Sequence, residues 1–379
     1  MSSSNKPASR TSVLQPSNVF KANNEKKKVP AVAFLFGDEF LITCCRDDCL
    51  QVIEAKTSKL VGNPWRDTAE SSQICTFAVS PDGKSVATGS KDGKIRLWTW
   101  NGKTAKIIAK STGHTAAANC VRWNPHDRGS HIASGFDDGR VAIWPVSELK
   151  NPINTHETCL RHIYAIDYSH DGTHLIVSGY DCKLSMLRVN EKTREIGLDK
   201  VRGVCSNPHQ VLSVASARTT DGHVIVTGST DGKIRIRPSE NPTYELEFGG
   251  HSDLVCAVVP SPNNDILASA SYDRTLRLWN LKAKRKIGPL QHSAGVSCAA
   301  FAGGGTLLAT GTCDGMIYVW EISDLLQDVT NVSTHMQRRL IATDTFMNQV
   351  HDNDADNEGV NIRPLHDAVR GTTHAPSGS

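Results

Sequence analysis

Apolar and polar residues alternate in three short runs within residues 248–280. The runs occupy residues 255–259, 266–270 and 276–278. A period of two residues is that of a β-strand with one buried face, and each run is too short for a helix. Ser261-Pro262 separates the first two runs, and these residue types favour turns. The segment is therefore predicted to be a three-stranded antiparallel meander.

The same pattern recurs along the chain, each time with an aspartate six residues before a tryptophan or its replacement. The pairs are Asp47/Ile53, Asp92/Trp98, Asp138/Trp144, Asp181/Leu187, Asp231/Arg237, Asp273/Trp279 and Asp314/Trp320. Successive aspartates lie 41 to 50 residues apart. Such even spacing is typical of a repeat protein in which each copy is one supersecondary unit.

Four copies end in tryptophan, and two begin with a Gly-His pair, Gly113-His114 and Gly250-His251. With a period of about 40 to 45 residues, the chain resembles the WD40 repeat family between about Asn18 and Ile322. This resemblance implies one four-stranded blade per copy and a closed ring of blades. The expected fold class is an all-β, seven-bladed WD40 β-propeller with flexible N- and C-terminal tails.

In the WD40 family, which this chain resembles, a histidine, a Ser or Thr, the turn aspartate and the tryptophan form one hydrogen-bonded tetrad per blade. Three copies contain all four residues: His114, Ser134, Asp138 and Trp144; His251, Ser269, Asp273 and Trp279; and His292, Thr310, Asp314 and Trp320. Buried indole N–H groups and carboxylates are costly without partners, so a complete tetrad stabilises its blade.

The remaining tetrads are incomplete. The second copy has Thr88, Asp92 and Trp98 without a histidine, and the fifth has His209, Thr227 and Asp231 with Arg237 in place of the tryptophan. In the fourth copy Ser178 and Asp181 are one residue closer together than elsewhere, and Leu187 replaces the tryptophan. Blades four and five are therefore predicted to be the least stable part of the ring.

The repeat divides the chain into a tail at 1–16, the propeller at 17–322, and a second tail at 323–379. The alternating segment Ser17–Ala22 is expected to pair with the seventh copy and to close the ring, because closure removes a free sheet edge. The stretch from Ser323 to Val350 has weak helical periodicity and is expected to form one or two short helices. Disorder is expected for the rest of both tails.

Net charge and cysteine content limit the kinds of ligand and compartment that the sequence supports. The formal net charge is only +3, which gives no support for nucleic acid as the main ligand. The eleven cysteines are odd in number, and several of them (Cys75, Cys120, Cys256 and Cys298) recur in the first strand of the repeat, so buried free thiols in a reducing compartment are expected. Neither a metal site, a small-molecule cofactor nor a membrane span is expected. The expected location is the cytoplasm, with the nucleus as a second compartment.

The family resemblance implies a platform that holds other proteins in a multiprotein complex, and no nucleophile-base motif suggests an enzyme. In the family, contacts often involve the residue before the turn aspartate and residues that enter the first strand. The candidate partner-binding residues are Arg46, Lys91, His162, Tyr164, Tyr180 and Tyr272. Tyrosine and arginine are frequent binding hot spots, which favours these positions.

Two alternatives remain open. The segment Trp279-Asn280-Leu281-Lys282 partly resembles the blade end of substrate receptors of cullin–RING ubiquitin ligases, although Asn280 replaces the acid. Single-stranded nucleic-acid binding is the second alternative, because Lys91, Lys94, Arg96 and Arg46 would form a basic arc over two blades. That arc lacks interleaved aromatic residues.

Overall fold

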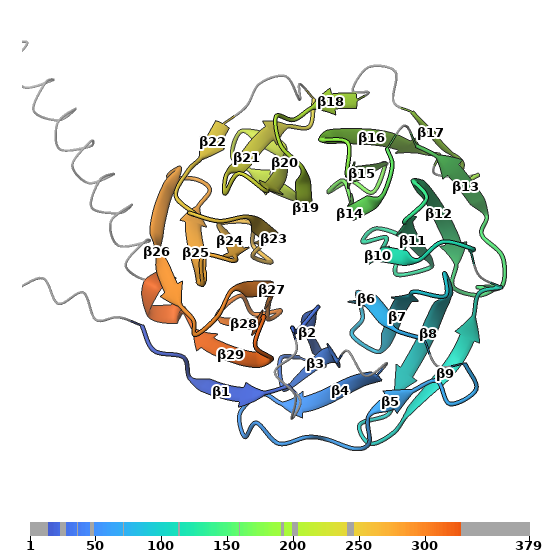
Figure 1. Cartoon of the computed structure of the whole chain (residues 1–379), viewed down its shortest axis with the longest axis horizontal. Helices are drawn as coiled ribbons and strands as arrows, with labels where there is room; N and C mark the ends of the chain where they lie inside the picture. Colours follow the sequence, from blue (N-terminus) through green and yellow to red (C-terminus); the bar gives the residue numbers. More distant parts are fainter. Residues whose placement is uncertain are drawn as a thin grey trace, which may run out of the picture. The chain divides into compact units, whose positions relative to one another are not determined.

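The computed structural model describes residues 14–22, 28–35, 37–45, 49–70, 72–112, 114–158, 160–190, 193–198, 204–240 and 246–326. Their strands form seven antiparallel sheets. The sheets follow one another around a ring, with the first strand of each sheet nearest the central channel (Figure 1). This arrangement confirms the predicted seven-bladed β-propeller. The flexible tails predicted from the sequence lie almost entirely outside the described residues.

The blades are numbered in chain order. Blade 1 contains β2 (Val32–Leu35), β3 (Phe40–Cys45), β4 (Cys49–Glu54) and β5 (Trp65–Arg66). Blade 2 contains β6 (Ile74–Val79), β7 (Ser85–Ser90), β8 (Ile95–Trp100) and β9 (Ala105–Lys110), and blade 3 contains β10 (Ala118–Trp123), β11 (His131–Phe136), β12 (Arg140–Pro145) and β13 (Asn154–Glu157). Blade 4 contains β14 (Ile163–Tyr168), β15 (His174–Gly179), β16 (Lys183–Val189), β17 (Ile196–Leu198) and β18 (Val204–Ser206).

Blade 5 contains β19 (Val211–Thr219), β20 (Gly222–Ser229), β21 (Ile234–Pro238) and β22 (Leu246–Phe248). Blade 6 contains β23 (Val255–Pro260), β24 (Ile266–Ser271), β25 (Thr275–Asn280) and β26 (Arg285–Gln291). Blade 7 contains β27 (Val296–Phe301), β28 (Leu307–Thr312) and β29 (Met316–Glu321), and its outer strand is β1 (Asn18–Lys21). Residues 323–326 form a single helical turn after β29.

The second strand of each blade is more buried than its alternating pattern suggests. In β24 both Leu267 and Ser269 are fully buried, although they lie on the face opposite Ile266 and Ala268. Each blade packs against a neighbour on both sides, so both faces of its middle strands are covered. The small polar residues of the pattern therefore belong to the interface between blades rather than to the surface.

The ring is closed by β1. Phe20 of this strand is 9% exposed, and the strand runs antiparallel to β29 with Val19 opposite Tyr318. The Ser17 N–H donates to the Val319 carbonyl oxygen at 2.7 Å, and the Glu321 N–H donates to Ser17 Oγ at 3.1 Å. The edge of β29 is thereby covered by the first strand of the same chain.

A second contact joins blade 1 to blade 7. The carboxylate of Asp38, in the β2–β3 turn, accepts hydrogen bonds from the backbone N–H groups of Gly303 at 2.6 Å and Gly304 at 3.1 Å. The run Gly303-Gly304-Gly305 is thus part of the turn between β27 and β28. Residues from the two ends of the propeller meet there as well as at β1.

The two faces of the ring carry different turns. We call the face with the turns between second and third strands the Asp-turn face, and the opposite face, with the turns between first and second strands, the hairpin face. On the Asp-turn face the residue after the aspartate has positive φ, as at Gly93 with φ of 75°. A Cβ atom on Gly93 would lie 1.8 Å from the His114 carbonyl oxygen, so only glycine fits there.

Blade 4 contains the longest insertion. Both β17 and β18 pair with the outer edge of β16, β17 opposite Leu187–Val189 and β18 opposite Lys183–Ser185. The extra residues between Asp181 and Asp231 therefore extend the outer edge of this blade.

Candidate functional site

The tetrad of blade 6 is complete. His251 lies 2.8 Å from Ser269 Oγ through Nε2 and 2.8 Å from Asp273 Oδ2 through Nδ1, and the Trp279 indole N–H donates to Ser269 Oγ at 2.9 Å. Burial lowers the pKa of His251, while the hydrogen bond with Asp273 opposes that effect. The histidine connects the second strand to the turn, and the tryptophan ties the third strand to the second.

The tetrads of blades 7 and 3 are partly joined. In blade 7, His292 Nε2 and the Trp320 indole N–H both contact Thr310 Oγ1, at 2.8 and 3.2 Å, but Nδ1 contacts the Leu290 carbonyl oxygen at 3.0 Å instead of Asp314. In blade 3, Trp144 donates to Ser134 at 2.7 Å, and His114 lies 3.5 Å from Asp138. The His114 ring stacks on Phe136 with 4.2 Å between centroids.

Buried arginines replace the histidine in blades 2 and 5. Arg96, 2% exposed, contacts Asp92 Oδ2 at 2.6 Å, and Arg235, also 2% exposed, contacts Asp231 Oδ2 at 2.6 Å. His209, proposed for the fifth tetrad, is half exposed and lies 3.7 Å from Asp231. An arginine cation therefore satisfies the turn aspartate in blades 2 and 5, where a neutral histidine does so in blade 6.

Blade 4 has no hydroxyl at the tetrad position. In blade 6 the tetrad residue Ser269 pairs with Arg277 of the next strand. The corresponding pair in blade 4 is Val177 and Ser185, so Val177 occupies the tetrad position. Ser178 therefore points to the opposite side of the sheet from the tetrad position, which explains its shorter spacing to Asp181. Leu187, in place of tryptophan, is fully buried in the blade's apolar core.

Acid is expected to destabilise the propeller through His292. Burial lowers the pKa of this imidazole from 6.5 to about 4. The unfolded chain then takes up the proton first, so the stability contributed by neutral His292 is complete above pH 6.5 and is lost as pH falls to about 4. Urea unfolding at pH 7 and pH 4 should show a loss of roughly 3 kcal/mol from this residue. A His292→Gln variant should lose less over the same interval, and an equal loss would contradict the assignment.

The predicted partner-binding residues are spread over several blades of the Asp-turn face. Lys91, Tyr180 and Tyr272 precede the turn aspartates of blades 2, 4 and 6, and His162 and Tyr164 lie at the start of β14. Arg46 lies outside the described residues. The structure brings His162, Tyr164 and Tyr180 together and places Tyr272 in other surroundings.

One group of side chains on this face, which we call the blade 3–4 cluster, consists of Asn119, Asp137, His162, Tyr164 and Tyr180. His162 Nδ1 lies 2.9 Å from Asp137 Oδ1, and the Asn119 amide donates to the same oxygen at 3.1 Å. The rings of His162 and Tyr180 meet edge to face at 6.0 Å. Burial raises the pKa of Tyr164, with smaller contributions from the charges of Tyr180 and Asp137.

Exposure distinguishes the cluster. Tyr180 is 47% exposed, and it is the only aromatic among the exposed large apolar side chains in the described part of the chain. His162 and Asp137 are each about half exposed. Asn119 and Asp137 were not among the candidates from the sequence. The sequence signal for Asp137 was the adjacent pair Asp137-Asp138. Asp138 is the tetrad aspartate, so Asp137 is left to contact other groups.

Tyr272 is occupied within the chain. Its hydroxyl accepts a hydrogen bond from Lys28 Nζ at 2.9 Å, and the ammonium also lies 5.5 Å from the ring centroid. Burial lowers the pKa of Lys28, but the hydrogen bond to Tyr272 and the charge interactions with Tyr272, Cys256 and Cys313 together raise it overall. This pair joins blade 6 to the segment that leads into blade 1.

Two of the four residues in the basic arc considered from the sequence are paired with carboxylates. Arg96 is buried, and its guanidinium lies 2.7 Å from Asp67 and 2.6 Å from Asp92. Lys94 lies 2.7 Å from Glu70. These two cations are neutralised within blade 2, because carboxylates from the β5–β6 connection reach them, and nucleic-acid binding at the arc stays an untested alternative.

Four cysteine thiols are among the residues that border a cavity at the centre of the ring. This cavity of about 240 Å³ is bordered by Cys75, Cys120, Cys256 and Cys298, together with Tyr164. Burial raises the pKa values of Cys120, Cys256 and Cys298 to about 12, so these thiols stay protonated and unreactive. Eight cysteines in the described segments are free.

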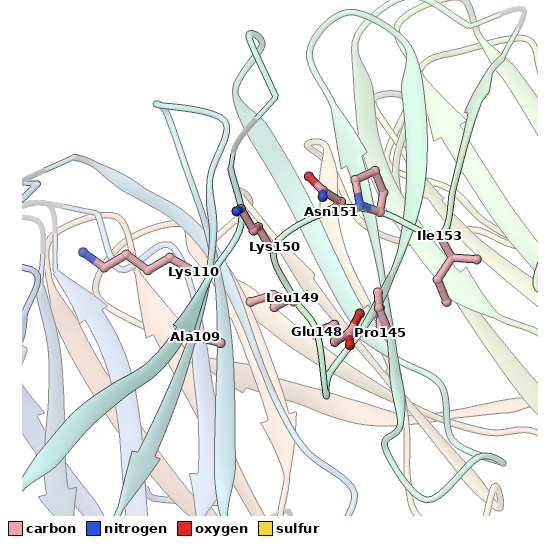
Figure 2. Close-up of a pocket in the computed structure, with 9 residues that line it drawn as sticks. Ala109, Lys110, Pro145, Glu148, Leu149, Lys150, Asn151 and Ile153 are labelled. Atoms are coloured by element: carbon pink, nitrogen blue, oxygen red, sulfur yellow. The ribbon is translucent and has the colours of Figure 1, made fainter.

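A larger hollow of about 570 Å³ lies on the outside of the ring between blades 2 and 3. It is lined by Ala109, Lys110, Pro145, Glu148, Leu149, Lys150, Asn151, Pro152 and Ile153. Figure 2 shows Lys110 directed away from this hollow and Leu149 directed toward the strand that carries Ala109. Within the described ranges no group of three or more His, Cys, Asp or Glu residues is placed to hold a metal ion. No helix among the described residues is long and apolar enough to span a membrane.

Comparison with known proteins identifies the family. The WD40 family, described as WD domain, G-beta repeat, matches residues 65–99, 105–145, 150–186, 199–237, 242–280 and 285–321. The chain belongs to this family. Each match runs from the outer strand of one blade to the third strand of the next, and β1 to β4 lie outside all six. The first copy in chain order, which has no family match, was visible in the sequence only through the Asp47/Ile53 spacing.

Relatives share the repeat at modest identity. The chain is 27% identical over 257 residues to the Periodic tryptophan protein 2 homolog of Dictyostelium discoideum, covering 66% of this chain and 26% of that protein. It is 30% identical over 178 residues to E3 ubiquitin-protein ligase COP1 of Arabidopsis thaliana, covering 46% and 24%. Protein transport protein sec13 of Aspergillus fumigatus is 26% identical over 272 residues, covering 63% and 88%. The chain spans only about a quarter of the length of the first two.

Proposed function

We propose that this chain is a non-catalytic scaffold that binds partner proteins on its Asp-turn face, with the blade 3–4 cluster as the main contact. The main support for this proposal is the exposed Tyr180, which lies next to His162. A hydrogen bond with Asp137 fixes the orientation of His162. A half-exposed aromatic side chain held by neighbouring groups loses little conformational freedom on binding, which favours a hot spot. A cytoplasmic or nuclear location remains a prediction.

The test compares the parent chain with a Tyr180→Ala/His162→Ala variant. Partners recovered by affinity purification and mass spectrometry should be lost from the variant, and the dissociation constant of the purified partner should rise about 30-fold or more, as for removal of a hot spot. The matched control is Leu60→Ala, because Leu60 is 63% exposed and lies outside the cluster. Retention of every partner by the double variant, with unchanged melting temperature, would refute the assignment.

The cullin–RING receptor is the second candidate, supported by the similarity to COP1. In the structure, Asn280 Oδ1 accepts a hydrogen bond from the Ala283 N–H at 2.7 Å, and Lys282 lies 2.6 Å from Asp265. Both residues of the partial receptor motif are therefore engaged within blade 6. A cullin adaptor among the purified partners would favour this candidate.

A further inference from the structure

Three histidines from consecutive blades lie in a row on the hairpin face, away from the blade 3–4 cluster. His126 belongs to the β10–β11 turn, His170 to the β14–β15 turn, and His223 to the start of β20. The ring centroids of His126 and His170 are 6.0 Å apart, and those of His170 and His223 are 5.1 Å apart and stacked. We call these three residues the histidine row.

His170, the central residue of the row, resists protonation in the free protein. Burial lowers the pKa of His170, and His223, His126 and Arg218 lower it further. Asp171 opposes them, but its carboxylate already accepts two hydrogen bonds from Thr173, at 3.0 and 2.7 Å. Added protons would therefore repel one another along the row unless an outside anion approached.

The other carboxylate beside the row is also engaged. Asp127, adjacent to His126 in the chain, lies 2.6 Å from His131 Nδ1 and 3.9 Å from Arg194. His174, which follows the His170 turn, is buried and contacts the Thr173 hydroxyl at 2.7 Å. The imidazoles of His126 and His223 are exposed, although His126 Nε2 contacts the His170 carbonyl oxygen.

The row continues into a basic surface on blades 5 and 6. The Arg218 N–H donates to Asn264 Oδ1 at 3.2 Å, and Lys284 lies 3.3 Å from Asp221, so the two blades are joined there. The exposed cations of this surface on blades 5 and 6 are Arg218, Lys282, Lys284 and Arg285, of which Lys282 pairs with Asp265 and Lys284 with Asp221. Protonation of the three histidines would add three positive charges beside them.

The chemistry of this surface favours an acidic protein segment over single-stranded nucleic acid. Nucleic-acid grooves combine positive charge with exposed aromatic rings on which bases stack. The exposed large apolar side chains of the described residues are Val19, Leu60, Ile108, Ile153 and Tyr180. The single aromatic residue of that set, Tyr180, lies on the Asp-turn face.

We propose that the histidine row and its adjoining cations form a second docking surface, which binds an Asp- and Glu-rich segment of a partner protein and takes up protons as that segment binds. Carboxylates of the segment stay ionised down to about pH 4, whereas imidazoles become charged below about pH 6.5. Because the bound state holds more protons than the free state, affinity increases as pH falls between these limits.

The test uses a fluorescein-labelled peptide of twelve aspartates and fluorescence anisotropy at low salt. The parent chain should bind about tenfold tighter or better at pH 5.8 than at pH 7.5, as expected for net uptake of a proton. His170→Gln/His223→Gln should remove most of this pH dependence, and Arg218→Gln/Lys284→Gln should weaken binding at both pH values. The control is His209→Gln, a half-exposed histidine on the Asp-turn face, which should change neither affinity.

Three results would overturn the proposal. One is an unchanged pH dependence in the His170→Gln/His223→Gln variant, and another is unchanged affinity in the Arg218→Gln/Lys284→Gln variant. The third is tighter binding of a twelve-residue oligouridine than of the peptide, which would indicate a nucleic-acid surface. Circular dichroism at both pH values shows whether each variant is folded, and the two variants give independent readouts. The Tyr180→Ala/His162→Ala variant should bind the peptide normally, so this test is separate from that of the scaffold.

Discussion

Removal of residues 1–23 is expected to lower the free energy of unfolding by roughly 5 kcal/mol or more, whereas removal of residues 1–12 leaves it unchanged. The longer deletion removes β1, together with the buried Phe20 and the hydrogen bonds to Val319 and Glu321. Burial of one large apolar side chain contributes about 2–3 kcal/mol, and each backbone hydrogen bond contributes about 1 kcal/mol. A loss of this size is comparable with the whole stability of many proteins.

Urea unfolding of the two truncated chains measures the effect directly. Phe20→Ala is the informative intermediate, because it keeps the backbone pairing and removes only the side chain, with an expected cost of about 3–5 kcal/mol. The chain lacking 1–23 should also associate at high concentration, because the exposed edge of β29 is available for pairing. Equal unfolding midpoints for the two deletions would show that β1 does not close the ring in solution.

Substitution of Arg96 by methionine is expected to cost about 3–5 kcal/mol, because it leaves Asp67 and Asp92 without the cation between them. Asp67 is 8% exposed in its side chain, and contacts with Lys110 and Arg96 keep its pKa at about 2 despite burial.

Lys94→Met is the matched control, since Lys94 pairs with Glu70 in the same blade but at the surface. Exposed pairs contribute about 1 kcal/mol or less, so the control should unfold almost like the parent. Chemical unfolding of both variants at pH 7 gives the comparison. If Arg96→Met cost no more than Lys94→Met, the buried ion pair would not be what holds the turn of blade 2.

The fold could be predicted from the sequence because each blade repeats the same strand pattern and the same spacing of its turn aspartate. The spacing of Asp47 and Ile53 was sufficient to place the first blade, although the family matches begin at residue 65. The strand register of blade 4 was harder to predict. Ser178 was assigned to the tetrad because it is a hydroxyl residue near Asp181, whereas strand pairing puts Val177 at that position.

The site was only partly readable, because a turn position does not say which neighbours a side chain will meet. Tyr180 and Tyr272 occupy equivalent positions, yet Tyr180 lies beside His162 while Tyr272 is held by Lys28, 244 residues earlier in the chain. Arg96 was assigned to a surface because it is charged. An aspartate four residues earlier, as in Asp92/Arg96 and Asp231/Arg235, was the signal for a buried pair.

Ring closure also sets an order of events during synthesis. β1 is made first, but its partner β29 follows about 300 residues later, as the 304-residue separation of Ser17 and Glu321 shows. At about 5–20 residues per second, β1 waits roughly 15–60 s after its own synthesis before β29 exists. Each blade can form as it is completed, so the nascent chain is an open arc whose last step joins its oldest strand to its newest.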